Sequence, residues 1–185
     1  MAPRAVIIGP PGAGKSTVGE LLAERLGVPF VDSDTAVEQR AGKTISELFT
    51  VDGEETFREL EQQTIAELLV EHTGVLALGG GAVLATATQQ RLRDYPVVLL
   101  GVGLAEGVRR TGMSVARPLL TGVNPRAMYR ELLDARLPTY RAVSSFEVST
   151  DERTPEQVVT EIESELFARP CQDSDGAGAG EKRSE

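Results

Sequence analysis

The sequence predicts an α/β fold, in which a five-stranded parallel sheet lies between two layers of helices. Short apolar, β-branched segments alternate with amphipathic segments along the whole chain. A glycine-rich turn joins the first of these strands to the first helix, as is typical of such folds. The 185 residues are 41% hydrophobic and 25% charged, which is enough for one domain with a substantial core.

Continuous apolar runs predict the five strands, at residues 5–8, 28–31, 75–78, 97–102 and 145–149. Helical spacing of apolar residues predicts the helices between them, at residues 16–26, 35–40, 44–49, 54–71, 86–93, 104–110, 125–137 and 155–168. Because strands and helices alternate, we expect parallel strand pairing and helices on both faces of the sheet.

Several residues mark where these helices begin and end. Gly27 and Gly42 end the first two helices, because glycine accepts the left-handed conformation found there. Thr44 and Glu47 have the spacing of a capping box, and Asp52-Gly53 predicts a turn before the long fourth helix. Proline is well tolerated in the first turn of a helix and destabilises the helix interior. We therefore expect the last two helices to begin at Pro125 and Pro155, and Pro138 to end the former.

The glycine-rich turn, Gly9-Pro10-Pro11-Gly12-Ala13-Gly14-Lys15-Ser16, fits the P-loop pattern G-x-x-x-x-G-K-[ST]. Free backbone N–H groups and the helix dipole attract an anion at such a helix start. An ordinary glycine-rich turn is the alternative. The residues expected to hold a nucleoside triphosphate are Gly12, Ala13, Gly14, Lys15, Ser16 and Thr17, with Lys15 on the β- and γ-phosphates and Ser16 on Mg²⁺.

Two further turns place polar or small residues at the edge where ligands bind in such sheets. The second strand leads into Asp32-Ser33-Asp34, whose carboxylates suit a metal ion and a substrate hydroxyl. Capping of the next helix is the alternative interpretation, and both can hold together. Gly79-Gly80-Gly81 follows the third strand and indicates close approach of a ligand or a positive φ. Arg58 and Glu61 share a helix face, where a surface ion pair is the simplest interpretation.

Residues 1–170 are expected to form a single domain, followed by a tail. The segment 111–124 lacks periodicity and contains Arg117, which predicts a mobile lid over a binding site. The stretch 171–185 is rich in Gly, Ala, Ser and charge, so we expect a disordered tail.

The composition argues against several classes of protein. A net charge of −9 argues against a nucleic-acid-binding surface. Cys171 is the single cysteine, which argues against a disulfide framework and fits the cytoplasm. The sequence shows neither a signal peptide nor an apolar stretch of membrane-spanning length.

A P-loop alone does not separate kinases from ATPases and GTPases. Asn124 is the single asparagine and precedes Pro125, so the Asn-Lys-x-Asp guanine reader of GTPases is absent. The strand at 97–102 does not end in acidic residues, and the chain is small, which argues against a motor or transport ATPase. Of the P-loop protein classes, the one that remains is a compact phosphotransferase with an arginine-bearing lid.

The motifs, in their order, resemble shikimate kinase, and the resemblance extends from Ala5 to about Phe167. They are the P-loop, Asp32-Ser33-Asp34, Gly53-Glu54 with Phe57-Arg58-x-x-Glu61, Gly79-Gly80-Gly81-Ala82, Arg117-Pro118-Leu119-Leu120 and Arg136-x-x-x-Tyr140. The resemblance implies a P-loop kinase fold and ATP-dependent phosphorylation of the shikimate 3-hydroxyl, a step towards chorismate and the aromatic amino acids. Ser33 stands where the family often has threonine.

The resemblance also implies roles for individual residues. Arg58 and Arg136 would clamp the shikimate carboxylate, for which the planar guanidinium is well shaped. Asp34 would orient or deprotonate the attacking hydroxyl, and Glu61 would contact a hydroxyl or hold Arg58. The substrate-binding residues implied in this way are Asp34, Arg58, Glu61, Gly79, Gly80, Gly81 and Arg136.

The remaining implied roles concern the nucleotide. Lys15 and Arg117 would neutralise charge on the transferred phosphoryl group, so the expected catalytic residues are Lys15, Asp34 and Arg117. Mg²⁺ would be bound by Ser16 directly and by Asp32 through water. Arg110, Arg153 and Pro155 would flank the adenine of ATP.

Two alternatives remain open. Another small-metabolite kinase, such as a gluconate or nucleoside monophosphate kinase, shares this architecture. A nucleotide-binding protein without turnover is the alternative from a different class. For the shikimate kinase interpretation we expect a cytoplasmic monomer whose partner is the small-molecule substrate shikimate, without a nucleic acid or a membrane.

Overall fold

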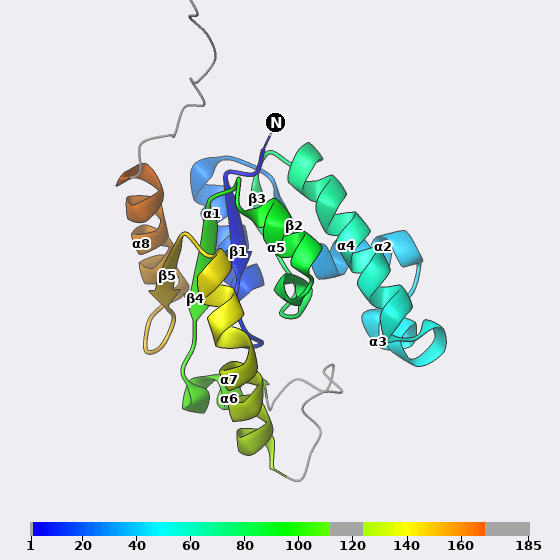
Figure 1. The fold of residues 1–185 in the computed structure, drawn as a ribbon. Coiled ribbons are helices and arrows are strands. Elements are labelled where there is room, and N and C mark those ends of the chain that lie inside the picture. The colour runs from blue at the N-terminus through cyan, green and yellow to red at the C-terminus, as the bar shows by residue number, and fades with distance from the viewer. Residues whose placement is uncertain (1, 112–123, 169–185) are drawn as a thin grey trace, which may run out of the picture.

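The computed structural model describes residues 2–111 and 124–168 (Figure 1). Five strands form one sheet of order β2-β3-β1-β4-β5, in which every pair is parallel. The strands are β1 (Ala5–Ile8), β2 (Phe30–Asp32), β3 (Val75–Ala77), β4 (Val97–Gly101) and β5 (Phe146–Ser149). The helices of the described part are α1 (Lys15–Leu26), α2 (Ser33–Ala41), α3 (Ile45–Glu47), α4 (Glu54–Glu71), α5 (Thr86–Leu92), α6 (Leu104–Thr111), α7 (Pro125–Val143) and α8 (Pro155–Ala168). The predicted parallel α/β architecture is confirmed.

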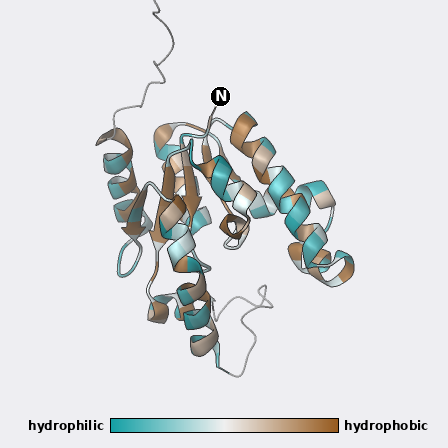
Figure 2. Ribbon diagram, in the orientation of Figure 1, coloured by the Kyte–Doolittle hydropathy of each residue, from teal (hydrophilic) through white to brown (hydrophobic). Residues whose placement is uncertain are grey.

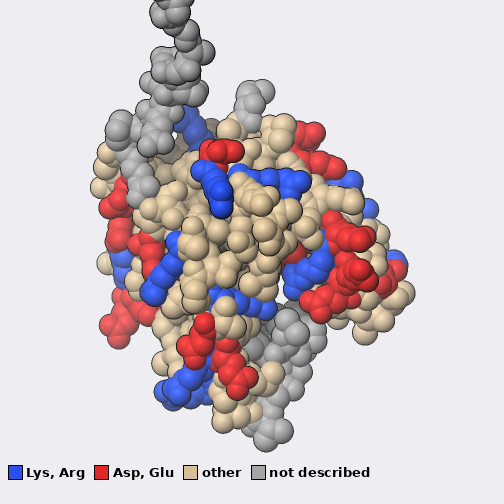
Figure 3. Space-filling view, viewed as in Figure 1, with Lys and Arg blue, Asp and Glu red and all other residues tan. Residues whose placement is uncertain are grey.

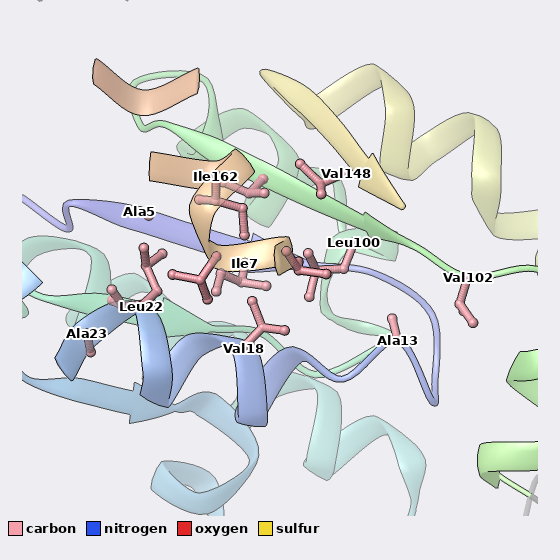
Figure 4. Close-up of a cluster of buried hydrophobic side chains, with 14 residues drawn as sticks. Ala5, Ile7, Ala13, Val18, Leu22, Ala23, Leu100, Val102, Val148 and Ile162 are labelled. Carbon is pink, nitrogen blue, oxygen red and sulfur yellow. The ribbon is translucent and has the colours of Figure 1, made fainter. Parts of the chain in front are cut away.

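Helices cover both faces of this sheet, and each face has its own apolar core. On one face, Val18 and Leu22 of α1 and Ile162 of α8 pack against alternate residues of β1 and β4 (Figure 4). On the other face, residues of α4, α5 and α7 pack against the remaining residues of those strands. Figure 2 shows the strands as a continuous apolar layer between helices of mixed hydropathy. Burying one Leu, Ile or Val side chain contributes about 1.5–3 kcal/mol, so these two cores stabilise the sheet that carries the site.

The order of strands brings three turns to one edge of the sheet. β1 lies at the centre, and its four residues are fully buried. The turns that follow β1, β2 and β3 are the P-loop, Asp32-Ser33-Asp34 and Gly79-Gly80-Gly81. Because β1 and β2 both pair with β3 in parallel, these turns meet at the carboxyl edge.

The prediction that a helix ends at Pro138 is wrong, because α7 continues from Pro125 to Val143 with that proline inside. Proline cannot donate to the carbonyl four residues earlier, here that of Asp134. Both Pro138 and Asp134 are exposed, so water can reach the released carbonyl. Beyond Pro138, Tyr140 is fully buried and its hydroxyl donates to the Gly80 carbonyl. This tertiary contact stabilises the turns of α7 that follow Pro138.

Around residues 32–53 the boundaries differ from the predicted ones. Helix α2 begins at Ser33, so Asp34 lies in its first turn, and the Asp32 side chain caps it. The capping box of Thr44 and Glu47 is present, but α3 is short and a π-helical turn, η1 (Leu48–Asp52), follows it. Asp52 is therefore the last residue of this π-helical turn, whereas the sequence predicted a separate turn at Asp52-Gly53.

Most of the predicted lid and the predicted tail, residues 112–123 and 169–185, lie outside the described residues.

Acidic and basic side chains lie side by side on the face shown in Figure 3. Among the described residues, Arg141 and Glu147 form an ion pair with 2.9 Å between Nε and Oε2. Among the described helices, none combines the length and apolar character needed to cross a membrane.

Candidate active site

A cavity of about 420 Å³ opens at the carboxyl edge of the sheet. It is bordered by all three turns that follow β1, β2 and β3, and by side chains from α4, α6 and α7. The predicted site residues that line it are Gly12, Gly14, Lys15, Ser16, Thr17, Asp32, Asp34, Arg58, Glu61, Gly79, Gly80, Gly81, Arg110 and Arg136. The fold thus brings together in one cavity residues that lie far apart in the sequence.

The P-loop has the backbone shape that an anion cradle needs. Gly12 has φ 81° and Gly14 has φ 83°, which is the left-handed region that favours glycine. Gly14 caps the start of α1 without a side chain, so no capping group competes for the helix N–H groups. The Lys15 ammonium lies across the loop and donates to the carbonyls of Gly9 (3.0 Å) and Pro10 (3.2 Å). Ala13, within the loop, has a fully buried side chain.

The turn after β2 is fixed by hydrogen bonds from three directions. The Ser16 hydroxyl donates to Asp32 Oδ2 at 2.6 Å, and the Asp34 N–H donates to Asp32 Oδ1 at 2.9 Å. Asp32 therefore caps α2 and contacts the P-loop at the same time, so both interpretations of its carboxylate are compatible. Ser33 is fully buried, and its Oγ accepts from the Gly79 N–H at 2.9 Å. That bond fastens the turn after β2 to the turn after β3.

Arg58 and Glu61 form more than a surface pair. Arg58 Nη1 donates to Glu61 Oε2 at 2.9 Å, and the Glu61 side chain is only 3% exposed. The Arg58 guanidinium also lies 5.1 Å from the ring centroid of Phe57 and 5.8 Å from that of Phe49. These contacts fix a planar cation at the cavity wall, and the surface-pair interpretation is wrong.

Gly79 and Gly81 are explained by close approach of a side chain and not by backbone conformation, because positive φ is found at other glycines of the described chain. A Cβ at Gly79 would overlap Asp34 Oδ1, and a Cβ at Gly81 would lie 2.7 Å from Arg58 Nη1. At Gly80 the nearest atom would be Pro11 Cδ, at 3.4 Å. Glycine in this turn therefore leaves space for the two charged side chains that the cavity contains.

Burial raises the pKa of the Glu61 carboxyl above its usual value, although the hydrogen bond and charge of Arg58 act to lower it. The neighbouring Asp34 carboxylate raises this pKa further, and Arg136 opposes the rise. Glu61 is thus within electrostatic reach of all three charged residues predicted to bind substrate.

Glu61→Gln should remove a pH dependence of stability. Because the folded state binds the Glu61 proton more tightly than the unfolded chain, ionisation lowers the free energy of unfolding as pH rises. The interval runs from the ordinary pKa of 4.5 upward through the raised native pKa. In urea denaturation at several pH values, the free energy of unfolding of the variant should therefore rise relative to that of wild type as the pH increases. Glu59→Gln, at an exposed position of the same helix, is the control, and parallel curves for E61Q and wild type would contradict the raised pKa.

Arg110 and Arg136 are each held by backbone oxygens. Arg110 donates to the carbonyls of Gly12 (3.2 Å) and Thr150 (3.1 Å), which holds it beside the P-loop. Arg136 Nη1 donates to the Gly80 carbonyl at 3.1 Å.

The other predicted residues lie elsewhere. Arg153 does not line the cavity; it pairs with Glu161 at 2.6 Å, and Pro155 begins α8. Arg117 lies outside the described residues.

Sequence reasoning missed part of the cavity wall. Ile45, Phe49 and Phe57 line it together with Arg58, and Pro11 of the P-loop lines it as well. Phe57 directly precedes Arg58, and this aromatic–arginine pair in the sequence could have identified Phe57 as a wall residue. No signal identified Phe49, because η1 brings it to the site.

Comparison with known proteins shows which family this chain resembles. The family model described as shikimate kinase matches residues 11–167. A shikimate kinase of Saccharopolyspora erythraea is 59% identical over 162 residues, which cover 88% of this chain and 93% of that protein. The solved shikimate kinase of Acinetobacter baumannii in complex with shikimate is 35% identical, with a TM-score of 0.86 over 91% of this chain and 94% of that one.

A gluconokinase from Sinorhizobium meliloti is 18% identical, with a TM-score of 0.56 over 89% of this chain and 91% of that one. That likeness shows a shared fold alone. The family model covers most of the chain, and the similarity to the shikimate kinase of Saccharopolyspora erythraea extends over nearly the whole of both proteins. The chain therefore belongs to the shikimate kinase family.

Proposed function

We propose that this chain transfers the γ-phosphoryl group of ATP to the 3-hydroxyl of shikimate. Members of its family are ATP-dependent kinases that phosphorylate an alcohol group of shikimate. The observation that carries the proposal for this chain is the shared cavity, in which the P-loop faces Asp34 and two arginines. A nucleoside triphosphate as phosphoryl donor and a hydroxylated carboxylic acid as acceptor fit the two sides of such a cavity.

On the acceptor side, Arg58 and Arg136 bind the shikimate carboxylate through charge-assisted hydrogen bonds. Asp34 accepts a hydrogen bond from the attacking hydroxyl and takes its proton as the oxygen attacks the γ-phosphorus. The bond from that phosphorus to the β–γ bridging oxygen then breaks, and ADP leaves. Glu61 holds Arg58 in place, and Gly79, Gly80 and Gly81 allow close approach of the substrate.

On the nucleotide side, backbone N–H groups of the P-loop, from Gly12 to Thr17, bind the phosphates. Lys15 neutralises charge on the β- and γ-phosphates, where negative charge concentrates in the transition state. Arg110 lies beside Gly12 and flanks the adenine.

The donor set fits Mg²⁺. Ser16 Oγ and Asp32 Oδ2 lie 2.6 Å apart at the cavity wall, which places a hydroxyl and a carboxylate oxygen together. Mg²⁺ prefers oxygen ligands and keeps several waters, so few protein ligands suffice. Ser16 would bind it directly and Asp32 through water. When bound, the ion neutralises phosphate charge and orients the β- and γ-oxygens.

A coupled ADP-release assay tests this proposal, with ATP and Mg²⁺ and with shikimate, gluconate and nucleoside monophosphates as acceptors. We expect kcat/KM for shikimate to exceed the others by several orders of magnitude, with phosphate on the 3-oxygen by NMR. Preference for gluconate or a nucleotide would support a different metabolite kinase. ATP binding without turnover on any acceptor would support a non-catalytic protein.

Arg136→Ala should raise KM for shikimate by about 10–100-fold, because a hydrogen bond to a charged group is worth about 1.5–3 kcal/mol. KM for ATP should change little, since Arg136 contacts the turn after β3 and not the P-loop. Initial-rate kinetics with each substrate varied will show the difference. Arg130→Ala, an exposed arginine on the same helix, is the matched control. Equal effects on both KM values would argue against a carboxylate clamp.

Gly79→Ala should lower kcat by on the order of 10²-fold, the cost of misplacing a reacting group by about 1 Å. The added methyl would overlap Asp34 Oδ1 and lie 3.3 Å from Glu61 Oε1, so the Asp34 carboxylate must move. The backbone of Gly79 is outside the positive φ range, so the fold itself tolerates alanine. Thermal melting should thus change little, and unchanged kcat would show that the position of Asp34 is not critical.

A further inference from the structure

Helix α7 carries two tyrosines that are fully buried, Tyr129 and Tyr140. Each hydroxyl donates to a backbone carbonyl in a distant segment. Tyr129 bonds to Pro11 O in the P-loop at 2.7 Å, and Tyr140 bonds to Gly80 O in the turn after β3. The first of these oxygens lies on the proposed nucleotide side of the cavity and the second on the proposed shikimate side.

The helix geometry suits this double contact. The two tyrosines are 11 residues apart, which is about three turns of about 3.6 residues, so both lie on one face. They are roughly 16 Å apart along the axis, at about 1.5 Å per residue. Figure 1 shows α7 running beside the carboxyl half of β4 and on past it. One helix therefore reaches both halves of the site.

Both carbonyls belong to peptides that end in a glycine of the cavity wall, namely Pro11–Gly12 and Gly80–Gly81. In a trans peptide the C=O and the following N–H point in opposite directions. A tyrosine that fixes the carbonyl therefore aims the glycine N–H away from α7. Within residues 2–111 and 124–168, neither of these N–H groups donates a hydrogen bond to the protein.

The surroundings of each hydroxyl leave it little freedom. A Cβ at Gly107 of α6 would overlap the Tyr129 ring, so glycine at this position admits the tyrosine. Arg136, one turn before Tyr140, donates to the same Gly80 carbonyl at 3.1 Å. Two donors from α7 thus fix the orientation of a single peptide group.

We propose that Tyr129 and Tyr140 are positioning residues with separate tasks. Tyr129 orients the Pro11–Gly12 peptide, so that its N–H is presented to a nucleotide phosphate. Tyr140 orients the Gly80–Gly81 peptide and steadies Arg136, so that both are presented to the acceptor. The assignment of the two sides rests on the proposed function.

The test removes one hydroxyl at a time, with Tyr129→Phe and Tyr140→Phe. A hydrogen bond contributes about 0.5–1.5 kcal/mol, so each loss should cost about two- to tenfold. We expect Y129F to raise KM for ATP and Kd for ADP by that factor while KM for shikimate is unchanged. We expect Y140F to raise KM for shikimate by a similar factor while Kd for ADP is unchanged.

Tyr95→Phe is the matched control, because it removes the hydroxyl of a half-buried tyrosine that does not line the cavity. It should change neither KM. A merely structural role would lower the melting temperatures of Y129F and Y140F and shift both KM values together, and that result would overturn the proposal. Equal KM values in Y129F, Y140F and wild type would also overturn it.

Calorimetry with ADP keeps this test distinct from that of the proposed function. Wild-type protein that binds ADP but does not phosphorylate shikimate would refute the proposed function. A selective loss of ADP affinity in Y129F would still support the nucleotide half of the inference, and equal ADP affinity in Y129F and Y140F would overturn it.

Discussion

Asp34→Asn is expected to lower kcat for shikimate phosphorylation by about 10²–10⁴-fold, the usual contribution of a positioned general base. Asparagine keeps the size of the side chain and still offers a carbonyl oxygen to a hydroxyl. It cannot take the proton that the attacking oxygen loses. KM for shikimate should therefore change much less than kcat. Steady-state kinetics by coupled ADP release at saturating ATP will separate the two constants.

Asp94→Asn, at an exposed position away from the cavity, is the matched control and should keep full activity. If D34N instead kept kcat within a few fold and raised only KM, Asp34 would orient the hydroxyl without deprotonating it. The side chain that caps α2 is that of Asp32. The substitution should therefore leave the melting temperature close to that of wild type.

Lys15→Ala should lower kcat by on the order of 10²–10³-fold, as expected for the loss of a group that stabilises transition-state charge. The ammonium lies along the P-loop, with 3.0 Å to the Gly9 carbonyl and 3.2 Å to that of Pro10, so it is held near the phosphate cradle. Its charge acts on the phosphoryl group as negative charge builds on the leaving oxygen. Affinity for ATP should fall too, because the ground-state phosphates are also charged.

Lys43→Ala is the matched control, because Lys43 lies outside the cavity and pairs with Asp52 at 2.7 Å on the surface. It should leave kcat unchanged. Activity of K15A within threefold of wild type would exclude Lys15 from the reaction, whatever its effect on ATP binding. Calorimetric titration with ADP and Mg²⁺ will show whether the loss lies in binding or in turnover.

Local signals predicted most elements and much of the site. The P-loop needs only eight consecutive residues to be recognised, because the glycines, the lysine and the serine act through adjacent backbone. The strand ends that carry Asp34 and Gly79 were found in the same way, since the carboxyl edge of a parallel sheet is fixed by topology. The structure adds that Asp34 and Gly79 touch, which spacing could not show.

Where local patterns alone point the wrong way, the cause is contact between segments distant in sequence. Pro138 signals a helix end locally, but burial of Tyr140 and its bond to Gly80 O stabilise the continuing helix. Arg58 and Glu61 look like a surface pair from spacing alone, but the packing of α4 against the sheet buries Glu61 and raises the pKa of its carboxyl. Propensity and spacing act over a few residues, whereas these effects depend on tertiary packing.

The sequence by itself determined the alternation of strands and helices, the phosphate-binding loop and the identity of the charged groups that suit the chemistry. It did so because periodicity, turn residues and loop motifs act through neighbours along the chain. Only the tertiary structure decided that Arg58, Arg136 and Asp34 border one cavity with Lys15, and that α7 contacts both halves of it. Those distances depend on how the helices pack on the sheet, and packing is a property of the whole chain.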